Sequence, residues 1–442
     1  MWELLPPRVR LVGPPCLSER SARQVAHDFE QCRDGLPRPL EAYVLATYGI
    51  DLTSEYAGMR VKNPLGKASG QLSLAPHQVE RDAAAGLGFV ILKTVIAQDS
   101  SGNQSMREWA IPETRMQIEP ICGRMGEQGW TVTWKGRGWF DTFGAYRTLF
   151  DQALSAGLVA DMLVVPSVKY HLPGGQETFW EQEEYSFTTL RLLETWSAAC
   201  GNRPMPLEKD FSPTLAGSER ASQQTKIGEW LRAVPGLIHR AAPGRVRVGL
   251  KIFNALFEDD FQLQMLDTVH DARSGEDRAD FLIYANRLFA PAMEFEGKLG
   301  VAYGGPDLSD RNLAVLERFL SVRSGARTRP ADRTDQLPIS ATGDIHSGRV
   351  AAEYLLRGAS SFQMHTIFQL PNRTFSMKGG TKTEKSLHHL LFHPQEGLIA
   401  WLLDLKGRFS WEQEMNVNQM AQWCQNNWKE VVEELSSATE NA

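Results

Sequence analysis

Short apolar runs alternate with longer amphipathic stretches along most of the chain. Each apolar run has about six residues, the length of a buried strand, and each amphipathic stretch has about ten to fifteen, the length of a helix. The expected strands are 88–94, 162–168, 206–211, 247–253, 281–286, 338–342 and 361–367. The expected helices between them are 77–85, 140–156, 185–199, 222–233, 259–269, 310–322 and 347–356. This order predicts repeated βαβ units with a parallel sheet.

The number of these units favours a closed sheet. About seven or eight of them fit within roughly 350 residues, as in a (β/α)8 TIM barrel. A doubly wound open sheet is the structural alternative, because it has the same alternation. We divide the chain into a Pro-rich N-terminal extension, 1–50, a barrel, 51–405, and a C-terminal helical tail, 406–442. In the extension, Ser18 is placed to cap a helix.

Composition and charge exclude several classes of protein. The chain has 442 residues, 42% of them hydrophobic and 23% charged, as expected for a globular protein with a large core. A formal net charge of −6 gives no general attraction to nucleic acid or to an anionic membrane. The five cysteines form no C-x-x-C pair, which argues against a disulfide framework, a zinc site or an iron–sulfur cluster. Without an apolar signal segment or a long apolar run, a cytoplasmic protein is expected.

The most informative turn lies in the segment 338–369. An expected strand ends at Thr342-Gly343-Asp344, a helix follows from near Ser347, and the next strand ends at His365-Thr366. Glycine lets backbone N–H groups approach an anion closely, and a helix N-terminus adds its dipole. The last two strands of a barrel commonly end in loops that bind phosphate. The turn therefore predicts a phosphate site, although an ordinary βα turn could have the same residues.

Six further segments, in order, resemble the dihydroorotate dehydrogenase family, whose members are barrels that bind flavin mononucleotide (FMN). They are VKNPLGKASG (61–70), GLGFVILKTV (86–95), GNQSMR (102–107), VGLKIF (248–253), DFLIYANR (280–287) and YGGPDL (303–308). The resemblance covers about residues 50 to 405. It implies FMN at the phosphate turn and an oxidoreductase in which hydride passes between flavin N5 and a C–C bond next to a carbonyl.

The resemblance also implies which residues contact FMN. They are Ala68, Ser69, Gly70, Lys93, Thr94, Asn103, Lys251, Asn286, Gly304, Gly305, Gly343, Asp344, His365 and Thr366. Lys251 would place a cation beside the N1–C2=O end of the flavin and stabilise its reduced, negatively charged form. Lys93 would contact flavin or substrate, and both lysines are candidate catalytic residues. A strand-end lysine that reaches solvent would look the same in sequence.

The substrate side departs from the family pattern. In EKDFSPT (208–214), Ser212 precedes proline and matches the family's catalytic base, which removes a proton as hydride leaves. Serine needs water or a polar relay for this task. The family's substrate-binding asparagines are replaced by Gly123, by Lys209 or Asp210, and by Thr214, and only Asn286 survives. The predicted substrate-binding residues are Lys93, Gly123, Asp210, Thr214, Asn286 and Arg287. We therefore expect a small substrate other than dihydroorotate, larger than orotate and with its own anionic or polar group.

Two other functions remain open. Two lysines in apolar strands, Lys93 and Lys251, also suit a Schiff-base aldolase, because desolvation lowers the pKa of a lysine. Loss of the substrate asparagines also suits a non-catalytic flavin-binding or scaffold barrel. Asp344, His346 and His365 lack the spacing of a metal site, so no metal is expected. The expected partners are a small-molecule substrate and an unknown electron acceptor. The protein could form a homodimer, and we expect it to bind neither nucleic acid nor a membrane.

Overall fold

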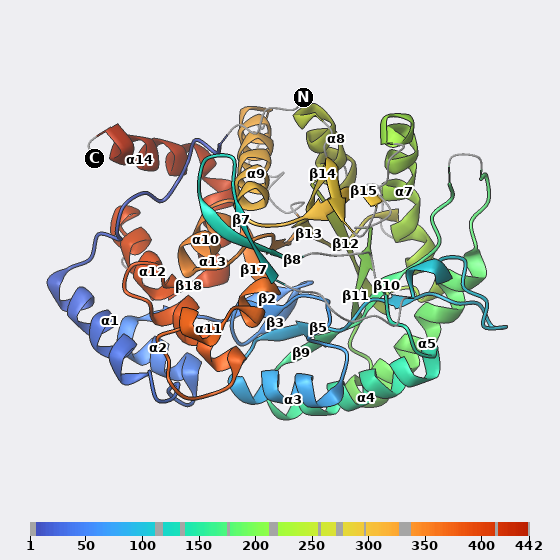
Figure 1. Ribbon diagram of the computed structural model, residues 1–442, viewed down its shortest axis with the longest axis horizontal. Coiled ribbons are helices and arrows are strands. Elements are labelled where there is room, and N and C mark those ends of the chain that lie inside the picture. The colour runs from blue at the N-terminus through green and yellow to red at the C-terminus, as the bar shows by residue number, and fades with distance from the viewer. Residues whose placement is uncertain are drawn as a thin grey trace.

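The protein is described from a computed structural model that covers residues 6–110, 118–132, 138–174, 177–211, 220–254, 258–270, 277–295, 298–326, 337–411 and 414–440. Within these residues, a central ring of parallel strands is surrounded by helices, as Figure 1 shows. This arrangement confirms the predicted α/β fold class, a (β/α)8 barrel with additions at both ends.

The barrel sheet closes on itself. Its strand order is β6-β10-β11-β12-β13-β16-β17-β4-β5-β9. The bounds are β4 (Leu65–Lys67), β5 (Phe89–Ile91), β6 (Val95–Ile96), β9 (Leu163–Val165), β10 (Ser167–Lys169), β11 (Met205–Asp210), β12 (Val246–Phe253), β13 (Phe281–Asn286), β16 (Ile339–Thr342) and β17 (Ala359–Met364). β5 and β6 are two halves of one interrupted strand, and so are β9 and β10. Because β5 pairs with β9 while β6 pairs with β10, the two ends of this order are joined, which excludes the open-sheet alternative.

Helices that follow the strands cover the outer face of the barrel. They are α3 (Pro76–Ala85), α4 (Phe143–Val159), α5 (Gln182–Cys200), α7 (Arg220–Ala241), α8 (Asp259–His270), α9 (Pro306–Ala326), α10 (Gly348–Leu356), α11 (Lys382–Phe392) and α12 (Leu398–Arg408). Local signals mark several ends. Pro76 opens α3, Gly86 closes it in a left-handed conformation, and Ser347 caps α10. The periodic pattern located most of these helices, but α7 continues through Pro235 well beyond its expected end.

The N-terminal extension is bonded to the barrel by buried charges. It contains α1 (Glu19–Gln31), capped by Ser18 as predicted, and α2 (Leu40–Tyr48). Before α1, the N–H of Leu11 donates to Glu353 of α10 at 3.0 Å, and Arg357 donates to the Val9 carbonyl at 2.7 Å. The Glu353 and Arg357 side chains are fully buried. Backbone groups of the extension therefore add hydrogen bonds to buried charges that also pair with Glu317 and Arg10.

The C-terminal tail packs outside the barrel. It contains β18 (Met415–Asn416), α13 (Val417–Asn426) and α14 (Trp428–Glu440). β18 pairs in parallel with β1 (Ile50–Asp51), so the tail adjoins the start of the barrel region. The Trp428 indole is buried and donates to Ser321 of α9 at 3.0 Å. None of the helices in the described residues combines the length and apolar character needed to cross a membrane.

Within the described residues, three antiparallel hairpins add to the barrel, and none of them was predicted. They are β2 (Ser54–Tyr56) with β3 (Met59–Val61), β7 (Ile118–Cys122) with β8 (Gln128–Val132), and β14 (Leu288–Phe295) with β15 (Lys298–Tyr303). The first supplies Tyr56, whose ring packs inside the barrel against Phe89 and Phe281 with centroids 4.8 and 5.1 Å apart. The other two lie beside the carboxyl ends of the barrel strands.

Candidate functional site

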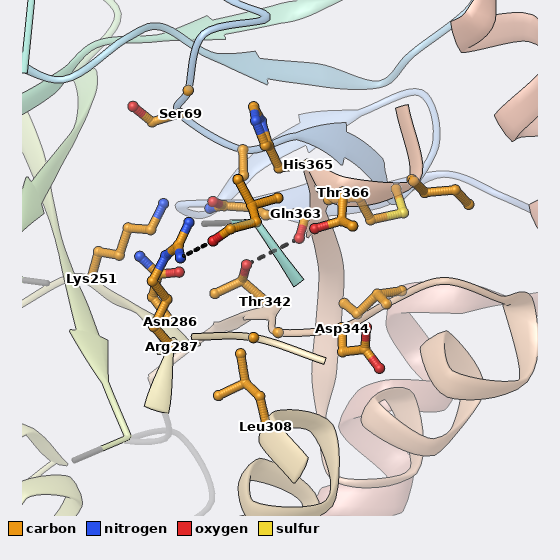
Figure 2. Close-up of a pocket in the computed structure, with 18 of the residues that line it drawn as sticks. Ser69, Lys251, Asn286, Arg287, Leu308, Thr342, Asp344, Gln363, His365 and Thr366 are labelled. Carbon is orange, nitrogen blue, oxygen red and sulfur yellow. Dashed lines mark hydrogen bonds between the residues drawn. The ribbon is translucent and has the colours of Figure 1, made fainter. Parts of the chain in front are cut away.

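A cleft opens at the carboxyl ends of the barrel strands. Its volume is about 940 Å³ with the solvent at its mouth included. Figure 2 shows Lys251, Asn286 and Arg287 on one side, with His365 and Thr366 across from them. In barrels, this end of the sheet is where ligands bind, because loops from several strands converge there.

Most of the predicted site residues line this one cleft. They are Ala68, Ser69, Gly70, Lys93, Thr94, Asp210, Lys251, Asn286, Arg287, Gly304, Gly305, Gly343, Asp344, His365 and Thr366. They come from segments far apart in the chain, and the parallel barrel brings their strand ends together. Their common location is a structural finding, whereas their individual roles stay predictions.

Four of the predicted residues are not placed in the cleft. Asn103 is exposed, and its N–H and amide both donate to the Asp99 carboxylate at 2.8 Å, closing a small loop on itself. Gly123 lies at the tip of the β7–β8 hairpin, where its N–H donates to the Glu127 carbonyl at 2.8 Å. The cofactor role of Asn103 and the substrate role of Gly123 thus gain no support from their positions. Ser212 and Thr214 lie outside the described residues.

The alternative between Lys209 and Asp210 is decided by the strand itself. Successive side chains of a strand point to opposite faces. Asp210 lines the cleft, whereas the Lys209 ammonium lies on the other face and donates to the Tyr170 carbonyl at 3.2 Å. Burial lowers the pKa of Lys209 well below its ordinary value. Asp210 is therefore the residue that takes the cleft-facing position.

The turn after β16 requires glycine. Gly343 has φ +118°, and a methyl group on it would lie 2.5 Å from Nδ2 of Asn312. That amide donates to the carbonyls of Ala285 and Thr342 at 2.8 and 3.0 Å, so it has little freedom to move. Asp344 follows with φ +51°, and its carboxylate points away from Lys251 and Arg287 in Figure 2. The backbone, and not the carboxylate, is thus presented to the cleft.

The helix after this turn contributes less than the sequence suggested. The N–H of Arg349 donates to the Glu396 carbonyl at 3.0 Å, and the N–H of Val350 donates to the Ser347 hydroxyl at 3.3 Å. These donors at the start of α10 are occupied within the protein. An anion in the cleft would therefore depend on the turn itself and on the end of β17.

His365 is a neutral imidazole. Burial, followed by the nearby cations Lys93 and Arg287, lowers its pKa to about 3. Its Nε2 lies 2.7 Å from the Gln369 amide nitrogen, and its Nδ1 is buried without a hydrogen-bond partner in the described residues. Gly70 makes room for this ring, since a methyl group there would lie 2.6 Å from Nδ1. The cleft thus has a buried polar atom for a ligand to satisfy.

Two cations, of which Lys251 is buried, form the opposite wall. The Lys251 ammonium lies 3.9 Å from Oε2 of Glu208, a carboxylate inside the barrel. The Arg287 guanidinium donates to the carbonyls of Val132 and Ala302 at 2.8 and 3.4 Å, and burial lowers its pKa to about 10. Arg287 therefore also connects the cleft to the β8 and β15 strands at its rim.

The β7–β8 hairpin is attached to the loop before α9. The Gly304 N–H donates to the Thr131 hydroxyl at 2.9 Å, and the Arg124 N–H donates to the Asp307 carboxylate at 2.7 Å. A methyl group on Gly304 would have no atom closer than 3.9 Å, so glycine keeps this wall of the cleft open. The hairpin thereby fixes one edge of the cleft.

The cleft also contains residues that the sequence reading missed. They are Val132, Leu308, Thr342, Ile345, His346, Gln363, Met364 and Ile367. Gln363 could have been found from strand alternation, because it lies two residues before His365 on the same face. Val132 and Leu308 carried no such signal. Nowhere in the described residues do three or more His, Cys, Asp or Glu side chains form a group that could hold a metal ion.

No family model matches the chain, and no curated protein matches it in sequence. Among solved structures, ligand-free type DHODH (dihydroorotate dehydrogenase) from Eimeria tenella is similar, with a TM-score of 0.52 at 14% identity, over 91% of this chain and 98% of that one. The chain has a DHODH-like fold. The same enzyme in complex with ferulenol gives a TM-score of 0.49 at 14% identity, over 91% of this chain and 94% of that one. At this identity, the DHODH likeness concerns the fold and not the activity.

Proposed function

We propose that this protein is an FMN-dependent oxidoreductase that transfers hydride between the flavin and a C–C bond next to a carbonyl. The observation that carries the proposal is the position of Lys251, a buried cation that shares one cleft with the glycine turn at Gly343. A cation and a phosphate-sized turn in the same cleft are what the two ends of FMN require. The DHODH-like fold supports the proposal in general terms.

The residues present fit FMN. The turn at Gly343 and Asp344, with His365 and Thr366 across the cleft, would hold the phosphate, and the backbone at Ala68–Gly70 would lie against the flavin ring. When bound, the flavin supplies hydride chemistry at N5. Lys251 would stabilise negative charge on the pyrimidine part of the ring, since preorganised cations act strongly where water is excluded.

We assign proton removal to Ser212. It follows Asp210, whose side chain faces the cleft at the end of β11. A serine hydroxyl is a weak base, so the proton must leave it through water or a polar neighbour. Asp210 is a suitable neighbour, because an ionised carboxylate accepts hydrogen bonds and can receive a proton.

The substrate is proposed to differ from dihydroorotate. A pyrimidine edge is recognised by paired donors and acceptors, which asparagine amides supply. In this cleft Asp210 can only accept when ionised, and Arg287 can only donate. A site built to hydrogen-bond particular groups of its substrate rejects a compound that does not match them by about 10⁴–10⁵-fold. Stopped-flow mixing of the oxidised enzyme with dihydroorotate should leave the flavin oxidised, and rapid bleaching at micromolar concentration would contradict the assignment.

The aldolase alternative receives less support. A Schiff-base enzyme needs a lysine amine that is free to attack a carbonyl, whereas the Lys251 ammonium lies 3.9 Å from the buried Glu208 carboxylate. The non-catalytic flavin-binding barrel differs from the proposal only in its chemistry. If that alternative is right, the protein binds FMN, but no compound in a panel of small carbonyl compounds reduces the oxidised flavin or reoxidises the reduced flavin.

The absorption spectrum of the purified protein tests the proposal directly. A yellow protein with one FMN per chain is expected, and the apoprotein should regain the flavin spectrum on addition of FMN. Riboflavin, which lacks the phosphate, is the control and should bind more weakly if the Gly343 turn holds that group. A colourless protein that cannot be reconstituted with FMN would end the proposal.

A further inference from the structure

A carboxylate lies inside the barrel, beneath the cleft. Glu208 is on the inward face of β11, two residues before Asp210, and its side chain is fully buried. The Tyr56 hydroxyl and the Gln363 amide nitrogen both donate to its Oε1. The Lys251 ammonium lies 3.9 Å from its Oε2. Two hydrogen-bond donors, from β2 and β17, and a nearby cation from β12 thus converge on one acidic group.

Such a group needs its neighbours. An ionised carboxylate away from water is costly unless hydrogen bonds and an opposite charge offset the lost hydration. Burial raises the pKa of Glu208, while Lys251, Tyr56 and Gln363 act in the other direction. Removing any of these partners would leave a buried charge less well compensated.

Glu208 also determines which way Gln363 faces. A carboxylate offers only acceptors, so the amide must turn its nitrogen toward Glu208 and its oxygen away. The Gln363 Oε1 is buried and has no hydrogen-bond partner in the described residues, although Gln363 lines the cleft. The cleft lining therefore has an unsatisfied acceptor in a fixed orientation, and the Lys251 cation lies 3.9 Å from the other oxygen of the same carboxylate.

We propose that Glu208 is a positioning residue that holds Lys251 as a cation and Gln363 as an acceptor for the pyrimidine edge of the flavin. This inference rests on the proposed function. The pyrimidine edge has carbonyl oxygens and one N–H, which match a cation and an acceptor side by side. Because Glu208 offsets part of the Lys251 charge, it makes bound FMN harder to reduce than a lone lysine would.

The first experiment is Glu208→Gln in the FMN-loaded protein, with the reduction potential as the readout. Removing the negative charge should favour reduced over oxidised FMN by about tenfold in relative affinity, a rise of about 30 mV for a two-electron couple. Glu353→Gln is the matched control. Like Glu208, Glu353 is a buried carboxylate with a cationic neighbour, but it lies on α10 against the N-terminal segment and does not line the cleft. An unchanged potential in Glu208→Gln would overturn the inference, as would an equal rise in the control.

A double-mutant cycle tests whether Glu208 acts through Lys251. In a Lys251→Met background, Glu208→Gln should shift the potential by less than half as much. An equal shift in both backgrounds would mean that Glu208 acts on the flavin directly, and positioning would be refuted. In the apoprotein, the unfolding free energies of the same variants should be coupled, because each single change leaves an unpaired buried group. Additive effects there would also contradict the pairing.

Gln363→Met provides a test that leaves every charge in place. It removes the acceptor together with the donor to Glu208 and keeps a side chain of similar size, so some stability should be lost, and FMN affinity is measured only on protein shown to be folded. FMN affinity should fall by about tenfold or more, the usual effect of losing one buried hydrogen bond. Wild-type affinity would refute the role of Gln363. If wild-type protein binds no FMN at all, the proposed function fails together with this inference, whereas normal binding with unchanged variants refutes the inference alone.

Discussion

Replacing Gly343 with alanine should disrupt the turn on which the proposed phosphate site depends. Two separate penalties follow from the structure. A residue with a side chain at φ +118° adopts a strained backbone, which costs about 1–3 kcal/mol. In addition, the new methyl group would lie 2.5 Å from Nδ2 of Asn312 and 2.9 Å from the Ala285 carbonyl, so one of them must move.

The second penalty comes from the hydrogen bonds of Asn312. Its amide is fully buried and donates to Ala285 and Thr342, and leaving a buried donor or acceptor unpaired costs about 1–3 kcal/mol. Together the two terms predict a loss of about 2–6 kcal/mol in unfolding free energy. This is a large share of the roughly 5–15 kcal/mol that stabilises a typical domain.

Alanine substitutions at two other glycines distinguish the backbone strain from the steric clash. Gly304→Ala adds a methyl group to the same cleft, with no atom within 3.9 Å and no left-handed backbone, so the change in stability should stay within about 0.5 kcal/mol. Gly244→Ala adds strain alone, because this exposed glycine has φ +66° and no atom within 4 Å of the new methyl group. It should lose about 1–2 kcal/mol.

Denaturant unfolding of the three apoproteins measures the losses, and FMN titration of the folded variants measures the site. Gly343→Ala should be the least stable and should bind FMN at least tenfold more weakly than wild type. Gly244→Ala should bind FMN normally. A Gly343→Ala protein that unfolds within about 1 kcal/mol of wild type would show that the turn geometry is wrong. One that is destabilised yet binds FMN fully would show that the phosphate lies elsewhere.

Three further predictions concern charge and proton transfer. Lys251→Met leaves buried Glu208 without the Lys251 cation and with a raised pKa, so the variant should lose about 3–5 kcal/mol at pH values above that pKa. The loss should fade as the pH falls from the raised pKa toward about 4.3, below which the acid is neutral in both the folded and the unfolded state; a loss independent of pH would contradict this. Because the pKa of His365 is lowered to about 3 in the folded protein, only the unfolded chain takes up a proton there as the pH drops below about 6.5, so the unfolding free energy of the apoprotein should fall. In His365→Gln the unfolding free energy should depend less on pH over this range, and the same pH dependence as in wild type would contradict the prediction. Ser212→Ala should slow flavin reduction by about 10²–10⁴-fold with FMN still bound, and an unchanged rate with the true substrate would assign the proton to another group.

Local sequence signals determined much of the architecture. The alternation of apolar runs with amphipathic stretches located most of the barrel strands and most of the helices between them, because burial on both faces of a parallel strand demands continuous apolar residues. The strands it located are β5, β9, β10, β11, β12, β13, β16 and β17. Glycine at 343 indicated a special turn, since few other residues adopt that backbone. Strand ends such as Lys251 and Asn286 then had to meet at one end of the barrel.

Only the tertiary structure decided what those residues meet. The side of the strand taken by Asp210 depends on the register of β11 within the barrel, and the sequence pattern alone left Lys209 as an alternative at the family's asparagine position. Asn103 matched a motif but bonds to Asp99 within its own loop. The contacts of Glu208 join residues 56, 251 and 363, which no local pattern relates. Periodicity reports which face of an element is buried, whereas the partners inside that buried space depend on how distant segments are brought together by the closed sheet.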